Sequence, residues 1–194
     1  MTQVKSMMTV SEIIARVGET DQIFLTAPTP MLAIERAQLR LMLVAISNNQ
    51  SEQLHFLGEA AVILELANTE VEDQKTSELI AVQLANVYLQ FNQVTPQKRY
   101  LIVTGQILRP HSNAENSDIF LGLARMDAAQ GKMALTKHWL ARWLKVFNPE
   151  VDFPELSHFA EFKSYLLDDW FQQIIQDAKN SLRRIPNPIT SVHS

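Results

Sequence analysis

The sequence contains no cysteine among its 194 residues. This absence excludes disulfide frameworks, thiolate zinc sites, iron–sulfur clusters and cysteine nucleophiles, and it fits a reducing, cytoplasmic location. Glycine is also scarce, with 5 residues. Neither a glycine-rich phosphate-binding loop nor a Gly-x-Ser-x-Gly nucleophile elbow occurs. We therefore expect no cofactor.

Long apolar runs are missing as well. A membrane-spanning helix needs roughly 20 consecutive apolar residues, and the most apolar stretch, residues 39–46, is interrupted by Arg40. The first 16 residues mix polar and apolar side chains and do not match a signal peptide. With a net charge of −4, nothing general attracts the chain to nucleic acid or to an anionic membrane. We expect neither as a partner.

Metal-binding and catalytic motifs are absent too. No His-x-x-x-His or His-Glu-x-x-His pair is formed by the five histidines, which are His55, His111, His138, His158 and His193. His138 and His158 can meet in space, but surface or capping roles are commoner for such residues. The adjacent acids Asp168 and Asp169 lack a second acid three residues later, so they cannot complete a magnesium cage. The sequence therefore predicts a protein without a metal that is not an enzyme.

Helix caps and apolar periodicity, in contrast, are abundant and predict an all-α fold. Thr9 and Glu12 match a capping box, and Gly18 is expected to close a short helix over residues 10–17. Thr29 and Pro30 supply a cap followed by a proline that suits the first helical turn. Further helices are expected from residue 51, over 75–91, after Thr95-Pro96 up to Pro110, over 117–130 and 134–147, and from about residue 162.

These signals predict three parts in the chain: a short helix and linker over residues 1–28, a single helical domain over 29–182 and a flexible tail over 183–194. Phe153-Pro154 is expected to open a short helix before the last long one. Gly58 lies within the helix that is expected to begin at residue 51, where glycine is less favourable for helix formation than alanine by about 1 kcal/mol. A close approach of a neighbouring helix is the expected reason for it.

A repeat emerges when the chain is compared with itself. Pro110 and Pro149 are 39 residues apart, and at the same offset Leu84-Ala85 matches Leu123-Ala124 while Asn92 matches Gly131. This plan of a Leu-Ala step, a turn residue and a terminal proline resembles the tetratricopeptide repeat (TPR) family over residues 30–149. This sequence departs from the family pattern in two ways. Asp127 stands where the family prefers tyrosine, and the family's repeats are usually 34 residues apart instead of 39. The resemblance implies antiparallel helical hairpins stacked as a short TPR-like solenoid with a C-terminal capping helix.

Aromatic residues concentrate near the end of the repeat. Trp139, Trp143 and Phe147 follow one another at four-residue spacing, which is typical of core packing and less often of a ligand-binding groove. The last helix, with Trp170 and Phe171, is the candidate to cover this stripe, since a solenoid needs an end cap.

The resemblance also implies a partner-binding groove lined by the first helix of each hairpin. Carried over from the family, the candidate residues are Leu79, Val82, Asn86, Leu89 and Gln90 in one hairpin and Asp118, Leu121 and Arg125 in the next, with Ala128 and Ala129 beside them. Asn86 can hydrogen bond to a peptide backbone, and Arg125 can bind a carboxylate with two hydrogen bonds. Both are also compatible with ordinary exposed helix positions.

Three functions fit these observations. The first is an adaptor or chaperone that binds a peptide or helical segment of another protein; small cytoplasmic chaperones of bacterial secretion systems are one example that resembles TPR stacks. The second is a structural subunit of a larger assembly. The third is an all-α enzyme or small-ligand-binding protein with an apolar pocket lined by Trp139 and Trp143. We expect the first.

A substitution tests the groove. If Arg125 binds a partner from an exposed position, Arg125→Glu should weaken partner capture without lowering the melting temperature. Unchanged capture would contradict the site.

Overall fold

The computed structural model describes residues 8–148 and 155–183, and all regular secondary structure in these residues is helical. The prediction of an all-α fold is confirmed. The chain divides into two compact units, Met1–His111 and Ser112–Ser194. The domain expected over residues 29–182 therefore spans parts of both units.

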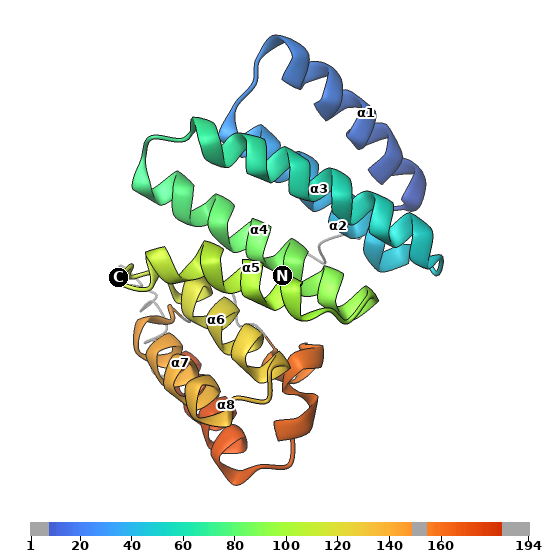
Figure 1. Cartoon of the computed structure of the whole chain (residues 1–194). Helices are drawn as coiled ribbons and strands as arrows, with labels where there is room; N and C mark the ends of the chain where they lie inside the picture. Colours follow the sequence, from blue (N-terminus) through green and yellow to red (C-terminus); the bar gives the residue numbers. More distant parts are fainter. Residues whose placement is uncertain (1–7, 149–154, 184–194) are drawn as a thin grey trace, which may run out of the picture. The chain divides into compact units, whose positions relative to one another are not determined.

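The first unit consists of helices in succession, each packed on the one before it (Figure 1). They are α1 (Val10–Thr26), α2 (Pro30–Ile46), α3 (Gln50–Glu70), α4 (Gln74–Val94), α5 (Lys98–Leu108) and the short 3-10 helix η1 (Arg109–His111). Each helix from α1 to α4 is connected to the next one of this series by a loop of only three residues, so neighbouring helices run antiparallel. α2 also contacts α4, which lies two helices further along the chain.

Side-chain caps begin the first four helices of this unit, whereas α5 has no side-chain cap. Thr9 and Glu12 form the expected capping box, and Thr29 accepts a hydrogen bond from the backbone amide of Leu32 with Pro30 in the first turn. Asn49 and Asp73 cap α3 and α4 in the same way. Each cap satisfies an amide that the helix itself leaves free.

Two apolar clusters hold the unit together. The larger is built from α2, α3 and α4, where Ala37, Leu57, Ala60, Leu64 and Ile80 have no measurable exposure. The smaller cluster joins Ile13 of α1 to Leu39 and Leu43 of α2. α1 is therefore attached to the unit through α2.

Three boundaries differ from the sequence prediction. α1 continues through Gly18 to Thr26, because Ile13 and the buried Thr20 keep the helix on α2 across the glycine.

α4 continues through Asn92, whose side chain accepts a hydrogen bond from the Gln97 amide at 3.2 Å. Asn92 is thus not the turn residue that the repeat alignment predicts. α5 begins at Lys98, so Pro96 lies in the connecting loop instead of the first turn.

The second unit contains α6 (Ser117–Ala129), α7 (Met133–Val146), two 3-10 helices, η2 (Leu156–His158) and η3 (Ala160–Tyr165), and α8 (Asp169–Arg183). Gly131 makes the tight turn between α6 and α7 in the left-handed region, with a φ of 70°. Its amide donates to the carbonyl of Ala128, and the Lys132 amide donates to that of Asp127, both at 2.9 Å. The prediction of a turn at Gly131 is confirmed.

The core of this unit is aromatic. Trp143, Phe120, Phe162 and Phe171 are fully buried, and Trp139 and Phe147 pack against the same cluster. The aromatic stripe of α7 is therefore core. α8 supplies Phe171 and Ala178 to it.

The last long helix begins at Asp169, later than expected. The residues from Ala160 to Tyr165 form η3 instead, which packs on α6. Asp168 precedes α8, and its carboxylate accepts a hydrogen bond from the Trp170 indole at 2.8 Å. Pro149, Phe153-Pro154 and residues 184–194 of the tail expected over 183–194 lie outside the described residues, whereas Arg183 is the last residue of α8.

Gly58 does not mark a close helix contact. A Cβ atom placed on it would meet no atom of a neighbouring helix within 4 Å, although the residue lies in the middle of α3. The close approach expected from the sequence is therefore wrong.

Alanine substitutions at two glycines should have opposite effects on stability. Gly131→Ala should lower the free energy of unfolding by about 1–2 kcal/mol, because the left-handed backbone is unfavourable for a residue with a Cβ. Gly58→Ala should raise it by up to about 1 kcal/mol, because alanine favours the helix and the space is open. Chemical denaturation measures both, and a loss of stability in Gly58→Ala would contradict the open space.

Candidate functional site

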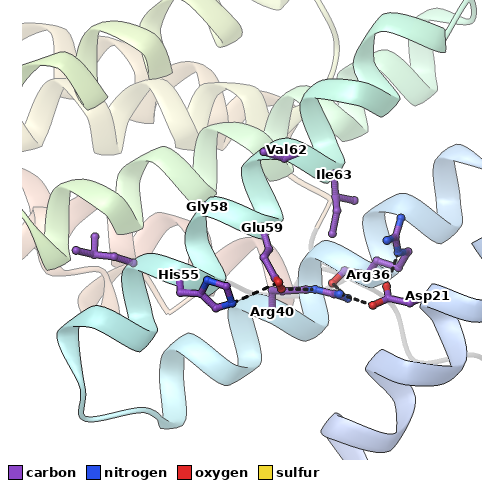
Figure 2. A pocket seen from close by; sticks show the side chains of 9 residues that line it. Asp21, Arg36, Arg40, His55, Gly58, Glu59, Val62 and Ile63 are labelled. Carbon is purple, nitrogen blue, oxygen red and sulfur yellow. Dashed lines mark hydrogen bonds and ion pairs between the residues drawn. The ribbon is translucent and has the colours of Figure 1, made fainter.

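A cleft of about 620 Å³ opens on the first unit where α1, α2 and α3 meet (Figure 2). Charged and apolar side chains from all three helices line it: Asp21, Arg36, Arg40, Leu54, His55, Gly58, Glu59, Val62 and Ile63. The cleft brings five ionisable side chains together, and we therefore take it as the candidate site.

Arg40 is the centre of the ionisable groups. Its side chain is only 5% exposed. One guanidinium nitrogen donates to Asp21 Oδ2 of α1 at 2.6 Å, and Nε donates to Glu59 Oε2 of α3 at 3.2 Å. A third donor reaches the backbone carbonyl of Arg36 at 3.3 Å. A buried guanidinium needs such partners to offset its desolvation.

Arg36 lies one turn before Arg40 on α2 and shares its carboxylate. Its Nε donates to Asp21 Oδ1 at 2.7 Å, and its guanidinium lies over the Phe24 ring, 4.1 Å from the centroid. Burial alone would raise the pKa of the Asp21 carboxyl, but the hydrogen bonds from Arg40 and Arg36 outweigh it and lower that pKa. Asp21 is therefore held as a carboxylate between two arginines.

His55 extends the network toward solvent. Its Nε2 lies 3.4 Å from Glu59 Oε1, and Figure 2 shows His55, Glu59, Arg40 and Asp21 joined in one chain of interactions. The carboxylates of Asp21 and Glu59 are 35% and 41% exposed, whereas the arginine between them is buried. The cleft thus presents acidic groups at its rim over a neutralised floor.

The apolar part of the lining lies beside these charges. Val62 is exposed, Leu54 and Ile63 are half-buried, and Gly58 leaves its neighbourhood on α3 open. A shallow cleft with aliphatic walls and a few fixed polar groups is suited to the surface of another molecule. No group of three or more His, Asp or Glu side chains in the described residues is placed to hold a metal ion.

The groove residues that the resemblance implies fall into both units. On α4, Leu79 is exposed, Leu89 is buried, and Val82, Asn86 and Gln90 are half-buried. On α6, Asp118 is exposed, Leu121 belongs to the core of the second unit, and Arg125 is buried. The α4 residues therefore lie on one helix of the first unit, and the α6 residues lie on one helix of the second.

Arg125 does not present the exposed guanidinium that the sequence predicts. Two of its nitrogens donate to the Glu161 carboxylate, at 3.1 and 3.4 Å, and its guanidinium lies over the Phe159 ring, 4.4 Å from the centroid. The Glu161 side chain is only 4% exposed. Arg125 thus joins α6 to the segment that contains η3, a role that helical spacing cannot reveal because Glu161 is 36 residues away.

Asp127 has a structural role of its own in the second unit. Its side chain is buried at the end of α6, where Oδ2 accepts a hydrogen bond from the Trp139 indole at 3.0 Å. Lys132 Nζ lies 3.7 Å from Oδ1. The carboxylate therefore ties α7 to the tight turn at Gly131.

The Arg40 network was not predicted from the sequence. A signal for it exists, because Arg36 and Arg40 are the only cations of α2 and are spaced by four residues, on one face of a largely apolar helix. The carboxylates that pair with them come from other helices and have no such signal.

Comparison with protein-family models, curated proteins and solved structures finds no match to the chain. None of the helices in the described residues is long and apolar enough to cross a membrane.

Acid should remove the contribution of Asp21 to stability. Because its pKa is lowered in the folded state, this contribution is present above the ordinary aspartate pKa of about 3.9 and is lost as the pH falls through the folded value. Asp21→Asn should therefore be less stable than the unsubstituted chain at pH 6, and the difference should shrink below about pH 4. Urea unfolding across this range measures it, and a difference that is independent of pH would contradict the pairing.

Arg125→Glu should destabilise the second unit, contrary to the expectation from the sequence. Removing one partner of a buried ion pair typically costs about 3–5 kcal/mol, and here the new carboxylate would face Glu161. Thermal unfolding measures the effect. Arg99→Glu, at an exposed position of α5 with no carboxylate partner within the described residues, is the matched control and should leave the melting temperature almost unchanged.

Proposed function

We propose that this chain is a non-catalytic protein-binding module, an adaptor or chaperone that holds a segment of another protein. The observation that carries the proposal is the distribution of exposed aliphatic side chains. Among the described residues, nine large apolar side chains are exposed on α1, α2 and α3: Val10, Ile14, Ile23, Leu25, Met31, Met42, Ile46, Val62 and Leu66.

Single exposed aliphatic residues are common on soluble proteins, whereas neighbouring ones mark contact surfaces. Val10 and Ile14 are one turn apart on α1, and Val62 and Leu66 are one turn apart on α3. Leaving such rows in water is unfavourable by about 25 cal/mol for each Å² of apolar surface. A bound protein would remove that surface from water.

The arrangement of the helices supports a TPR-like version of this function. The pairs α2–α3 and α4–α5 are antiparallel neighbours, and α2 contacts α4 as the first helices of successive hairpins do in a stack. In this proposal α8 is the capping helix, since it supplies apolar side chains to the core of the second unit. The exposed Leu79 and the half-buried Asn86 of α4 then belong to the groove side.

Capture by the full-length chain tests the function. The tagged protein, purified from cross-linked cells of its own organism, should retain a reproducible set of proteins that mass spectrometry identifies. Val62→Asp or Leu79→Asp should reduce that set at an unchanged melting temperature, because each puts a charge on an exposed apolar position.

Leu167→Asp is the matched control. Leu167 is 96% exposed in the second unit, so the same chemical change there should leave capture intact. Identical capture by all three variants would contradict the proposal, as would a chain that retains no protein at all.

A further inference from the structure

One row of α3 faces the cleft with a gap in its middle. Leu54, Gly58 and Val62 line the cleft at four-residue steps, and Leu66 continues the row by another step. Residues at this spacing form a ridge along a helix. We call these four residues the α3 row. Its large side chains flank Gly58, where no atom of the protein fills the space.

The other wall of the cleft belongs to α1. Asp21 lines the cleft, Ile14 lies seven residues before it and Leu25 four residues after it, so the three share one face of the helix. Ile14 and Leu25 are both exposed. Exposed aliphatic side chains of α1 therefore share the helical face that carries Asp21.

Gly58 is unfavourable within the folded chain. Glycine in a helix interior is destabilising relative to alanine, and no close contact explains its presence here. A gap between Leu54 and Val62 has the form of a hole that a side chain of another helix fills when ridges pack into grooves.

The three helices around the cleft carry a net negative charge. Helices α1, α2 and α3 carry eight carboxylates, three arginines and no lysine. Each arginine is already paired: Arg16 with Glu19 and Glu35, Arg36 with Asp21, and Arg40 with Asp21 and Glu59. The remaining carboxylates of these helices, Glu12, Glu52, Glu65 and Glu70, have no cationic partner within the described residues. This surface therefore attracts a cationic partner.

We propose that the cleft between α1 and α3 holds a basic amphipathic α-helix of a partner protein, with one large aliphatic side chain seated at Gly58. The inference rests on the proposed function and specifies its partner class. The α3 row covers twelve residue steps, about 18 Å at 1.5 Å per residue, which corresponds to a partner helix of about 12–15 residues. Lysine or arginine flanks of that helix are attracted by the net negative charge of α1, α2 and α3.

A second copy of this chain does not supply such a helix from its described residues. Two helices are basic and have no acidic residue: α5, with Lys98 and Arg99, and α7, with Lys137, Arg142 and Lys145. Their apolar sides, however, are buried in their own units, through Leu101 and Leu108 of α5 and through Leu140 and Trp143 of α7. The occupant is therefore a helix of a different protein.

Binding of synthetic peptides to the full-length chain tests the proposal. The probes are a 15-residue Leu/Lys amphipathic helical peptide and a Leu/Glu peptide with the same leucine positions, each followed by fluorescence anisotropy. The Leu/Lys peptide should bind at least about tenfold more tightly, and its affinity should fall with added salt. Equal affinity for the two peptides would overturn the proposal.

Substitutions at the gap place the site. Gly58→Phe should weaken binding of the Leu/Lys peptide by about tenfold or more, because the ring occupies the hole. Gly58→Ala adds only a methyl group and should bind nearly as well, and Leu167→Asp should bind as the unsubstituted chain does. Circular dichroism melts establish that Gly58→Phe is folded. Undiminished binding by folded Gly58→Phe would overturn the site.

Two further results would distinguish a failure of the cleft proposal from a failure of the proposed protein-binding function. If the chain is a dimer in light scattering and Gly58→Phe makes it a monomer, a second copy occupies the cleft and the proposal is wrong. If Gly58→Phe still captures the cellular proteins that Leu79→Asp loses, the protein-binding function stands while the cleft assignment fails.

Discussion

The buried guanidinium of Arg40 is the interaction on which the arrangement of the first three helices depends. It donates hydrogen bonds to one carboxylate of α1 and to another of α3, and its own helix, α2, packs against both of these helices. Without Asp21 and Glu59 the charge would have no partner from either wall, and burying it would be strongly unfavourable. The same contacts fix the cleft, since they hold two helices that present aliphatic side chains to solvent.

The second unit uses polar contacts in a related way but hides them. The Arg125–Glu161 pair and the Asp127–Trp139 hydrogen bond are both buried and connect segments that are distant or reversed in direction. Because these side chains are buried against their partners, little of their surface is left to contact another molecule. In the first unit the corresponding acids are partly exposed, which is why the candidate site lies there.

Local signals predicted much of the fold. Thr9, Thr29 and Gly131 act through the backbone within a few residues, so their effects on helix starts and on the tight turn can be identified from the sequence. Gly18 and Asn92 show where such reasoning fails. Both are common at helix ends, yet packing of neighbouring apolar residues keeps the helix intact through each of them. The start of α8 was missed because periodicity alone does not distinguish the 3-10 segment η3 from a helical turn.

The candidate site was harder to predict than the fold. The family pattern directs attention to one face of α4 and α6, whereas the Arg40 network depends on pairs 19 residues apart in the sequence. The gap at Gly58 became informative only when its surroundings were known, since the sequence alone favours a close helix contact. Long-range pairing and unfilled space are properties of the folded chain.

Hydrogen–deuterium exchange of the full-length chain, alone and bound to a captured partner, tests the central claim most directly. Backbone amides of α1 and α3 should exchange more slowly in the complex, because a helix in the cleft suppresses their local opening. Those of α6 and α7 should be unchanged. Slower exchange that is confined to helices outside α1, α2 and α3 would contradict the assignment of the cleft as the binding surface.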